Sequence, residues 1–156
     1  MGLDMYLSAK RYASKYIDEG LATKIAASIS DEAPPTAGNL ESIEVATEVA
    51  YWRKASAIHT WFVREVQGGK DDCNSYYVTP EDLAKLRDTC LDLLTDRSEA
   101  RAKLLLPTSE GFFFGPTDYG EYYWEQVEET AEKLKQILEW HNGRGSRWSF
   151  SYQSSW

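Results

Sequence analysis

The longest amphipathic stripe in the chain follows residue 120, and it constrains the fold more than any other feature. Side chains that suit a core recur at spacings of three or four in Tyr123, Val127, Ala131, Leu134, Leu138 and His141. This spacing places them on one face of a helix, which packs against the rest of the molecule. Glycines in residues 141–146 break the pattern, so the sequence predicts a long helix that ends there.

Segments of alternating character predict strands at both ends of the chain. Apolar and polar side chains alternate in residues 4–12, and aromatic and small polar ones alternate in residues 148–156. Residues 41–50 also resemble a strand, although the alternation breaks at Ala46 and the residue after it. Residues 71–77 are expected to be a loop that leads into a short further strand. Because a period of two is typical of a half-buried strand, we expect four strands.

Helical spacing appears in two segments of the first half. Residues 17–30 predict a short helix, followed by an exposed Pro/Gly-rich loop at residues 31–39. From Arg53 to Val66 the apolar residues again recur at three or four, and we expect a helix that starts at Arg53. The glycines that follow Gln67 should end it, because glycine readily adopts the left-handed conformation of a helix cap.

The strongest helix start is Thr79-Pro80-Glu81-Asp82, with a capping threonine, a proline at the first helical position and two acids near the positive end. A second helical piece covers residues 98–106 and stops at Pro107. No internal repeat is present. The sequence therefore predicts one α+β domain over residues 1–156, with a small antiparallel sheet of about four strands packed against three to four helices.

Charge and composition limit the classes of partner. The 156 residues carry a net charge of −8, so we expect no binding of long nucleic acid, which favours basic proteins. A local basic patch could still hold a small anion, because contacts in a pocket act at short range. Cys73 and Cys90 are too few for a disulfide framework, and neither a secretory signal nor a membrane-length apolar stretch is visible. These features predict a cytoplasmic protein without a membrane association.

Two aromatic segments point to a binding site. Residues 112–124 hold seven aromatic side chains and open inside the bracket Gly111-Phe-Phe-Phe-Gly115. A loop this aromatic either plugs the core or forms a stacking surface. The segment that begins with Tyr51 and Trp52 adds two cations, Arg53 and Lys54, to the same set of side chains. Together they favour a site that stacks a flat ligand.

Arg53 and Lys54 are the candidate anion contacts. The predicted strand-to-helix junction would place them where free backbone N–H groups attract anions. Arginine can bind a phosphate with two parallel hydrogen bonds, and Trp52 could stack on a base. The alternative is that Trp52 belongs to the core and both cations are solvated.

His59, Asp71, Asp72 and Cys73 are weaker candidates for chemistry. A histidine near the apolar face of a helix is more often buried with a hydrogen-bond partner than catalytic. A nucleophilic cysteine needs an activating base, and a metal site needs more ligands than this loop shows. We therefore predict no catalytic residues, no metal and no cofactor. The expected ligand-binding set is Tyr51, Trp52, Arg53, Lys54, His59, Phe113, Thr117, Asp118 and Tyr119. Thr117 or Asp118 is also expected to cap the last helix.

Several motifs together resemble a family of small uncharacterised phage and prophage proteins. They are Met-Gly-Leu-Asp-Met-Tyr-Leu at the start, residues 48–63 around Tyr-Trp-Arg-Lys and Ile-His-Thr-Trp-Phe, Asp-Asp-Cys at 71–73, Gly-Phe-Phe-Phe-Gly-Pro-Thr-Asp-Tyr at 111–119 and Gln-Ser-Ser-Trp at the end. The resemblance spans nearly the whole chain except residues 18–40 and 95–106. It implies a setting rather than a mechanism, because small phage proteins of this kind often counter host defences, some by sequestering nucleotide signals.

Residues and resemblance together predict a non-enzymatic protein that sequesters a small nucleotide-like ligand in the host cell, with homo-oligomerisation possible. One alternative is an acidic inhibitor that docks on a host defence protein, steered by its net charge of −8. Another is a nucleotide hydrolase that uses His59 with Asp71 or Asp72 as acid and base.

Overall fold

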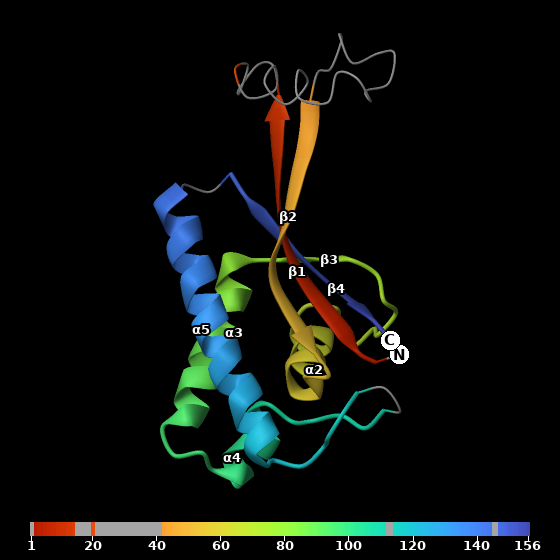
Figure 1. The fold of residues 1–156 in the computed structure, drawn as a ribbon, viewed down its shortest axis with the longest axis vertical. Coiled ribbons are helices and arrows are strands. Elements are labelled where there is room, and N and C mark those ends of the chain that lie inside the picture. The colour runs from red at the N-terminus through yellow and green to blue at the C-terminus, as the bar shows by residue number, and fades with distance from the viewer. Residues whose placement is uncertain (1, 15–19, 21–41, 112–113, 145–146) are drawn as a thin grey trace.

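The computed structural model describes residues 2–14, 20, 42–111, 114–144 and 147–156 (Figure 1). Its elements in chain order are β1 (Asp4–Ser14), β2 (Ser42–Arg53), α2 (Ser56–Glu65), β3 (Tyr76–Val78), α3 (Pro80–Leu94), α4 (Glu99–Leu105), α5 (Glu121–Arg144) and β4 (Ser149–Ser155). The predicted α+β class, with a four-stranded antiparallel sheet and helices, is confirmed. The helix expected over 17–30 and the loop over 31–39 lie outside the described residues, as does Phe113.

The sheet has the strand order β2-β1-β4-β3, and its described pairs are all antiparallel. Asp4 at the start of β1 pairs with Arg53 on one side and with Ser155 on the other. The irregularity expected at Ala46 falls slightly later, because Leu7 pairs with Ala50 whereas Ser8 pairs with Glu48. The intervening Val49 is the extra residue of a β-bulge.

One face of the sheet and the helices enclose the core. Leu3, Met5, Leu7 and Ala9 are completely buried, while the residues between them are partly accessible. The whole stripe that predicted α5 is buried, which confirms that helix and its packed face. The helices gather on this side of the sheet (Figure 1).

Helix α3 begins as its sequence predicts. The Thr79 side chain accepts a hydrogen bond from the Asp82 backbone at 3.0 Å, and the Asp82 carboxylate accepts one from the Thr79 backbone at 3.0 Å. This reciprocal capping box satisfies two N–H groups at the helix start. Helix α2, in contrast, has the cap residue Ala55 and no side-chain cap.

The predicted start of α2 at Arg53 is wrong. Arg53 is the last residue of β2, because it still pairs with Asp4, and the Lys54 N–H donates to the Leu3 carbonyl at 2.8 Å. Lys54 then turns the chain in the left-handed region with φ 54°, and helical residues begin at Ser56. The end of this helix is confirmed, since Gly68 and Gly69 both have positive φ angles.

Strands β1 and β2 extend beyond the rest of the sheet as a two-stranded arm (Figure 1). Strand β4 accompanies β1 only as far as Lys10, which pairs with Ser149. From Arg11 to Ser14, the only described strand that pairs with β1 is β2. Tyr12 in this arm is 67% exposed.

Candidate functional site

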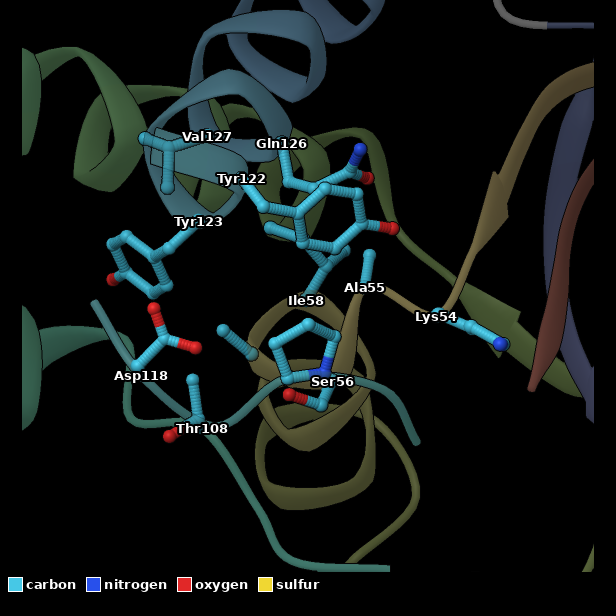
Figure 2. A pocket seen from close by; sticks show the side chains of 12 residues that line it. Lys54, Ala55, Ser56, Ile58, Thr108, Asp118, Tyr122, Tyr123, Gln126 and Val127 are labelled. Atoms are coloured by element: carbon cyan, nitrogen blue, oxygen red, sulfur yellow. The ribbon is translucent and has the colours of Figure 1, made fainter. Parts of the chain in front are cut away.

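A narrow pocket opens where the start of α2 meets the first half of α5 and the loop that precedes α5 (Figure 2). The space inside it that can hold the centres of water molecules is only about 20 Å³, whereas about 300 Å³ is reached when the open solvent at its mouth is included. Its walls are formed by Lys54, Ala55, Ser56, Ala57, Ile58, Thr108, Pro116, Asp118, Tyr122, Tyr123, Gln126 and Val127.

The start of α2 presents unpaired backbone donors to this pocket. The first hydrogen bond of the helix runs from the His59 N–H to the Ala55 carbonyl, at 3.0 Å. Within the described part of the chain, the N–H groups of Ser56, Ala57 and Ile58 have no acceptor, although these residues are only 3%, 6% and 1% exposed. A buried helix start without a cap is unusual and marks a place for an external acceptor.

Two polar side chains add to these donors. Ser56 makes no side-chain hydrogen bond to any described residue, and its hydroxyl lines the pocket. The Oε1 atom of Gln126 is buried and also has no partner in this part of the chain. Gln126 lies one helical turn after Tyr122, and Figure 2 shows both side chains on the same side of the pocket. The pocket therefore combines a cluster of donors with an unsatisfied amide and an aromatic ring.

Hydrogen bonds hold the α5 side of the pocket in place. The Tyr122 hydroxyl donates to the Arg53 carbonyl at 2.8 Å, and the Tyr123 hydroxyl donates to the Leu106 carbonyl at 2.9 Å. Burial raises the pKa of both hydroxyls above the ordinary tyrosine value, and nearby Glu129 and Glu125 raise that of Tyr122 further. Both tyrosines therefore remain neutral at physiological pH.

Asp118 is the predicted site residue that this pocket most clearly includes. Its Oδ2 atom accepts a hydrogen bond from the Gly120 N–H at 3.2 Å, which stabilises the turn ahead of α5. The expectation that Asp118 or Thr117 caps α5 is wrong, because the helix begins at Glu121 and Gly120 occupies the cap position.

Lys54 forms part of the wall with its backbone and the base of its side chain. A Cβ atom on Gly115 would lie 2.9 Å from Lys54 Cβ, and one on Gly2 would lie 3.1 Å from Lys54 Cε. The two glycines thus allow the lysine to pack between them. Its amino group points away from the pocket (Figure 2), so the ammonium is not a wall of the cavity.

The other residues of the first aromatic segment lie elsewhere. Trp52 is 1% exposed, and its Nε1 donates to Thr130 Oγ1 at 2.9 Å, so its ring belongs to the core. Tyr51 and Arg53 alternate with Trp52 along β2 and project from the opposite face of the sheet. There the Tyr51 hydroxyl donates to Asp4, and Arg53 Nε lies 3.9 Å from the same carboxylate.

His59 is buried in a hydrogen-bonded group instead of lining the pocket. Its Nδ1 lies 2.8 Å from the Tyr152 hydroxyl and its Nε2 lies 3.0 Å from Asp71 Oδ2. The other oxygen of Asp71 accepts from Trp156 Nε1 at 3.1 Å. Because both ring nitrogens are occupied and the residue is 1% exposed, this geometry is that of a structural histidine.

The alternative acid for a hydrolase, Asp72, is used in a turn. Its carboxylate accepts from the Asn74 N–H at 3.1 Å and from the Tyr76 hydroxyl at 2.9 Å. The hydrogen bond from Asn74 is the main reason why the pKa of Asp72 is lowered. Nothing in this geometry directs Asp72 toward His59.

Thr117 and Tyr119 hold the loop together. The Thr108 hydroxyl donates to the Thr117 carbonyl at 2.9 Å, and the Thr108 N–H donates to the Tyr119 hydroxyl at 3.3 Å. The structure thus brings Lys54 and Asp118 of the predicted set to one pocket, whereas the other described members lie in the core, in the loop or on the far face of the sheet.

Ser56, Tyr122 and Gln126 are pocket residues that sequence reasoning missed. For Ser56 the sequence contained a clue, because the residue before it, Ala55, occupies the N-cap position, where Ser, Thr, Asp or Asn is usual. For the other two, the spacing of four residues in a helix places both side chains on one face. Their orientation toward α2 depends on packing that no local pattern encodes.

Comparison of this chain with family models, with curated proteins and with solved structures gave no match. Among the described helices, none has the combination of length and hydropathy that crossing a bilayer requires. In the same residues, no three His, Cys, Asp or Glu side chains are grouped closely enough to hold a metal ion.

Proposed function

We propose that the protein binds a small phosphate-bearing, nucleotide-like ligand and holds it without transforming it. The observation that carries this proposal is the start of α2, where three N–H groups of buried residues and the Ser56 hydroxyl have no acceptor among the described residues and belong to the lining of one pocket. A phosphate accepts several hydrogen bonds at once and is favoured by the positive end of a helix dipole. A chemical group without acceptor oxygens would bind poorly to these N–H and hydroxyl donors.

The size of the pocket limits the ligand. Its interior offers only about 20 Å³ to the centres of water molecules, which is room for about one water, so only one end of a ligand could enter it. A phosphoryl oxygen would enter it, against α2, and the remainder of the ligand would lie at the mouth. There the half-exposed ring of Tyr122 offers a face for stacking and Gln126 offers an amide.

Sequestration is the role that this site would serve. The resemblance to small phage proteins suggests a host-cell setting in which nucleotide signals of a defence system are removed by binding. The net charge of −8 disfavours long nucleic acid but acts weakly on a small anion inside a pocket, because salt screens distant surface charges.

Isothermal titration with inorganic phosphate, mononucleotides, ADP-ribose and cyclic dinucleotides tests the proposal. We expect at least one phosphate-bearing compound to bind with a Kd in about the micromolar range or tighter. Recovery of the compound intact after denaturation would support binding without hydrolysis, and chemically altered nucleotide would favour the hydrolase instead. An absence of binding across the whole panel would rule the proposal out.

Ser56→Ala is the matching variant. It removes a donor from the pocket and should weaken phosphate binding by about three- to tenfold, with little effect on folding. Ser75→Ala, which changes an exposed serine in the loop before β3, is the control and should bind as the natural protein does.

A groove between α3 and α5 favours a second candidate function, docking on a basic protein. It offers about 430 Å³ to the centres of water molecules, and its apolar floor includes Leu91, which is 47% exposed, and Leu94. Acidic side chains border it, among them Glu128 and Glu132. An apolar groove with an acidic rim suits a basic amphipathic segment of a host defence protein.

Leu91→Glu separates the two functions. The variant should abolish capture of a stoichiometric protein partner from host lysate if docking is the function, because it places a charge on the apolar floor. Phosphate binding at α2 should be unaffected. A partner that is captured equally well by Leu91→Glu would exclude this groove as the docking surface.

A further inference from the structure

A carboxylate lies in the same pocket as the anion-binding donors of α2. Asp118 is exposed, and in the described residues no cation pairs with it. Its Oδ2 is held by the Gly120 N–H at 3.2 Å, and a Cβ atom at residue 120 would lie 2.5 Å from that oxygen. Glycine at this position therefore leaves room for the carboxylate, and the turn keeps it at the pocket wall.

Asp118 would repel a ligand that is only an anion. Two negative charges in one small pocket repel each other, and the solvent that reaches the exposed Asp118 weakens this repulsion without removing it. The repulsion is offset only if the ligand also brings hydrogen-bond donors to the carboxylate. A ligand that fits this pocket therefore needs hydrogen-bond acceptors where it faces α2 and hydrogen-bond donors where it faces Asp118.

Resting on the phosphate binding proposed above, we infer that the ligand is a ribonucleotide whose ribose hydroxyls donate hydrogen bonds to Asp118. A ribonucleotide carries phosphate oxygens and a vicinal diol a few bonds apart. Pairing of a helix N-terminus with the phosphate and of an acidic side chain with ribose hydroxyls is an established solution in nucleotide sites. Here Ser56 and the N–H groups of α2 supply the first half, and Asp118 supplies the second.

The buried Oε1 atom of Gln126 is independent support for a ligand in this pocket. It has no partner among the described residues, and Gln126 lines the pocket. Buried side-chain oxygens are normally hydrogen-bonded, and an exception calls for a partner that is absent from the protein itself. Asp118 then determines which phosphate compounds are accepted.

The test compares adenosine and uridine 5′-monophosphates with their 2′,3′-dideoxy forms and with inorganic phosphate. We expect the ribonucleotides to bind the natural protein at least about tenfold more tightly than the dideoxy forms. In Asp118→Asn this ratio should fall below about threefold, while inorganic phosphate binds as well as before or better, because the like charge is gone.

Asp118→Asn keeps an oxygen that can accept from Gly120, so the turn should survive, which its melting temperature checks. Asp72→Asn is the matched control, since Asp72 accepts from the Asn74 N–H at 3.1 Å in an equivalent turn outside the pocket. It loses the same charge and should leave the preference for ribose unchanged.

The outcomes separate this inference from the proposed function. Equal binding of ribo and dideoxy forms to the natural protein would overturn the role of Asp118 and leave phosphate binding standing. A preference for ribose that persists in Asp118→Asn would also overturn it. If inorganic phosphate and all nucleotides fail to bind, the proposed function itself fails.

Discussion

The hydroxyl of Tyr152, a residue of β4, lies 2.8 Å from Nδ1 of His59 in α2, and both side chains are buried. A His59 Nε2–H would donate to the Asp71 carboxylate, which leaves Nδ1 to accept from the Tyr152 hydroxyl. The tyrosine ring also stacks on Phe62, with centroids 3.9 Å apart. Burial raises the pKa of this hydroxyl well above its ordinary value, so it stays a hydrogen-bond donor.

Tyr152→Phe should lower the free energy of unfolding by about 1–3 kcal/mol, because it leaves a buried ring nitrogen without a partner. Urea denaturation measures the change. Tyr77→Phe is the control, since Tyr77 is 64% exposed and its change should stay within about 0.5 kcal/mol. A loss of ligand binding without a loss of stability would place His59 in the functional site instead.

Ala55→Asp should strengthen α2 and abolish anion binding at the same time. A carboxylate at the cap position would accept from the free N–H groups of the helix, which is worth about 1 kcal/mol, and would occupy the place of the phosphate. Thermal unfolding and phosphate titration measure the two effects. Ser98→Asp adds the same charge at the cap of α4, outside the pocket, and should leave affinity unchanged. Retained affinity in Ala55→Asp would exclude this helix start as the anion site.

Arg53→Ala should change phosphate affinity by less than about threefold, because solvent and salt screen its charge from the pocket. The side chain is 60% exposed and lies 3.9 Å from Asp4 on the far face of the sheet. An exposed pair of this kind contributes between about 0 and 1 kcal/mol to stability. A drop in affinity of about tenfold or more would show that the ligand reaches that face.

Gly115→Ala and Gly143→Ala should have opposite effects on stability. Gly115 has φ 87°, and an added Cβ would lie 2.9 Å from Lys54 Cβ, so alanine there should cost at least about 1–2 kcal/mol. Gly143 lies within α5 with open space around its Cα, and alanine should stabilise by about 0.5–1 kcal/mol. Denaturation midpoints of the two variants give the comparison, and equal shifts would contradict the strain assigned to Gly115.

Stability should fall as the pH rises above about 9, partly because of Cys90. Burial raises the pKa of its thiol from 9.0 to about 12. Between these values the unfolded chain binds fewer protons than the folded one, so the free energy of unfolding decreases with pH. In Cys90→Ala the decline between pH 9 and 12 should be shallower than in the natural protein. An identical slope in both proteins would show that the thiol ionises normally in the fold.

The elements that local patterns define were predictable from the sequence. The stripe of α5 repeats over many residues, and the capping box of Thr79 and Asp82 is complete within four positions. The start of α2 could not be predicted in this way, because it depends on the pairing of Arg53 with Asp4, and these two residues are far apart in sequence. A strand that continues by hydrogen bonding to a distant partner overrides the helical spacing that follows it.

The site was less predictable than the fold, since residue type does not reveal which way a side chain points. Trp52 and Arg53 are neighbours of suitable chemistry, yet the alternation of β2 sends one to the core and the other to the far face. Ser56 belongs to no recognisable sequence motif. It matters because Ala55, at the N-cap position, has no side chain that could accept hydrogen bonds from the first N–H groups of α2. Only the packing of α5 and its preceding loop over that helix start creates the pocket.

The arm formed by the end of β1 and the start of β2 implies that the two halves of β1 differ in local stability. Up to Lys10, β1 pairs with β2 on one side and β4 on the other, and beyond Lys10 the only described strand that pairs with it is β2. An isolated two-stranded ribbon is marginal in water, so the arm should open without unfolding the domain. Backbone amides from Arg11 to Ser14 should therefore exchange with deuterium much faster than those of Met5 and Leu7. The boundary would fall where β4 ends, within a single continuous strand.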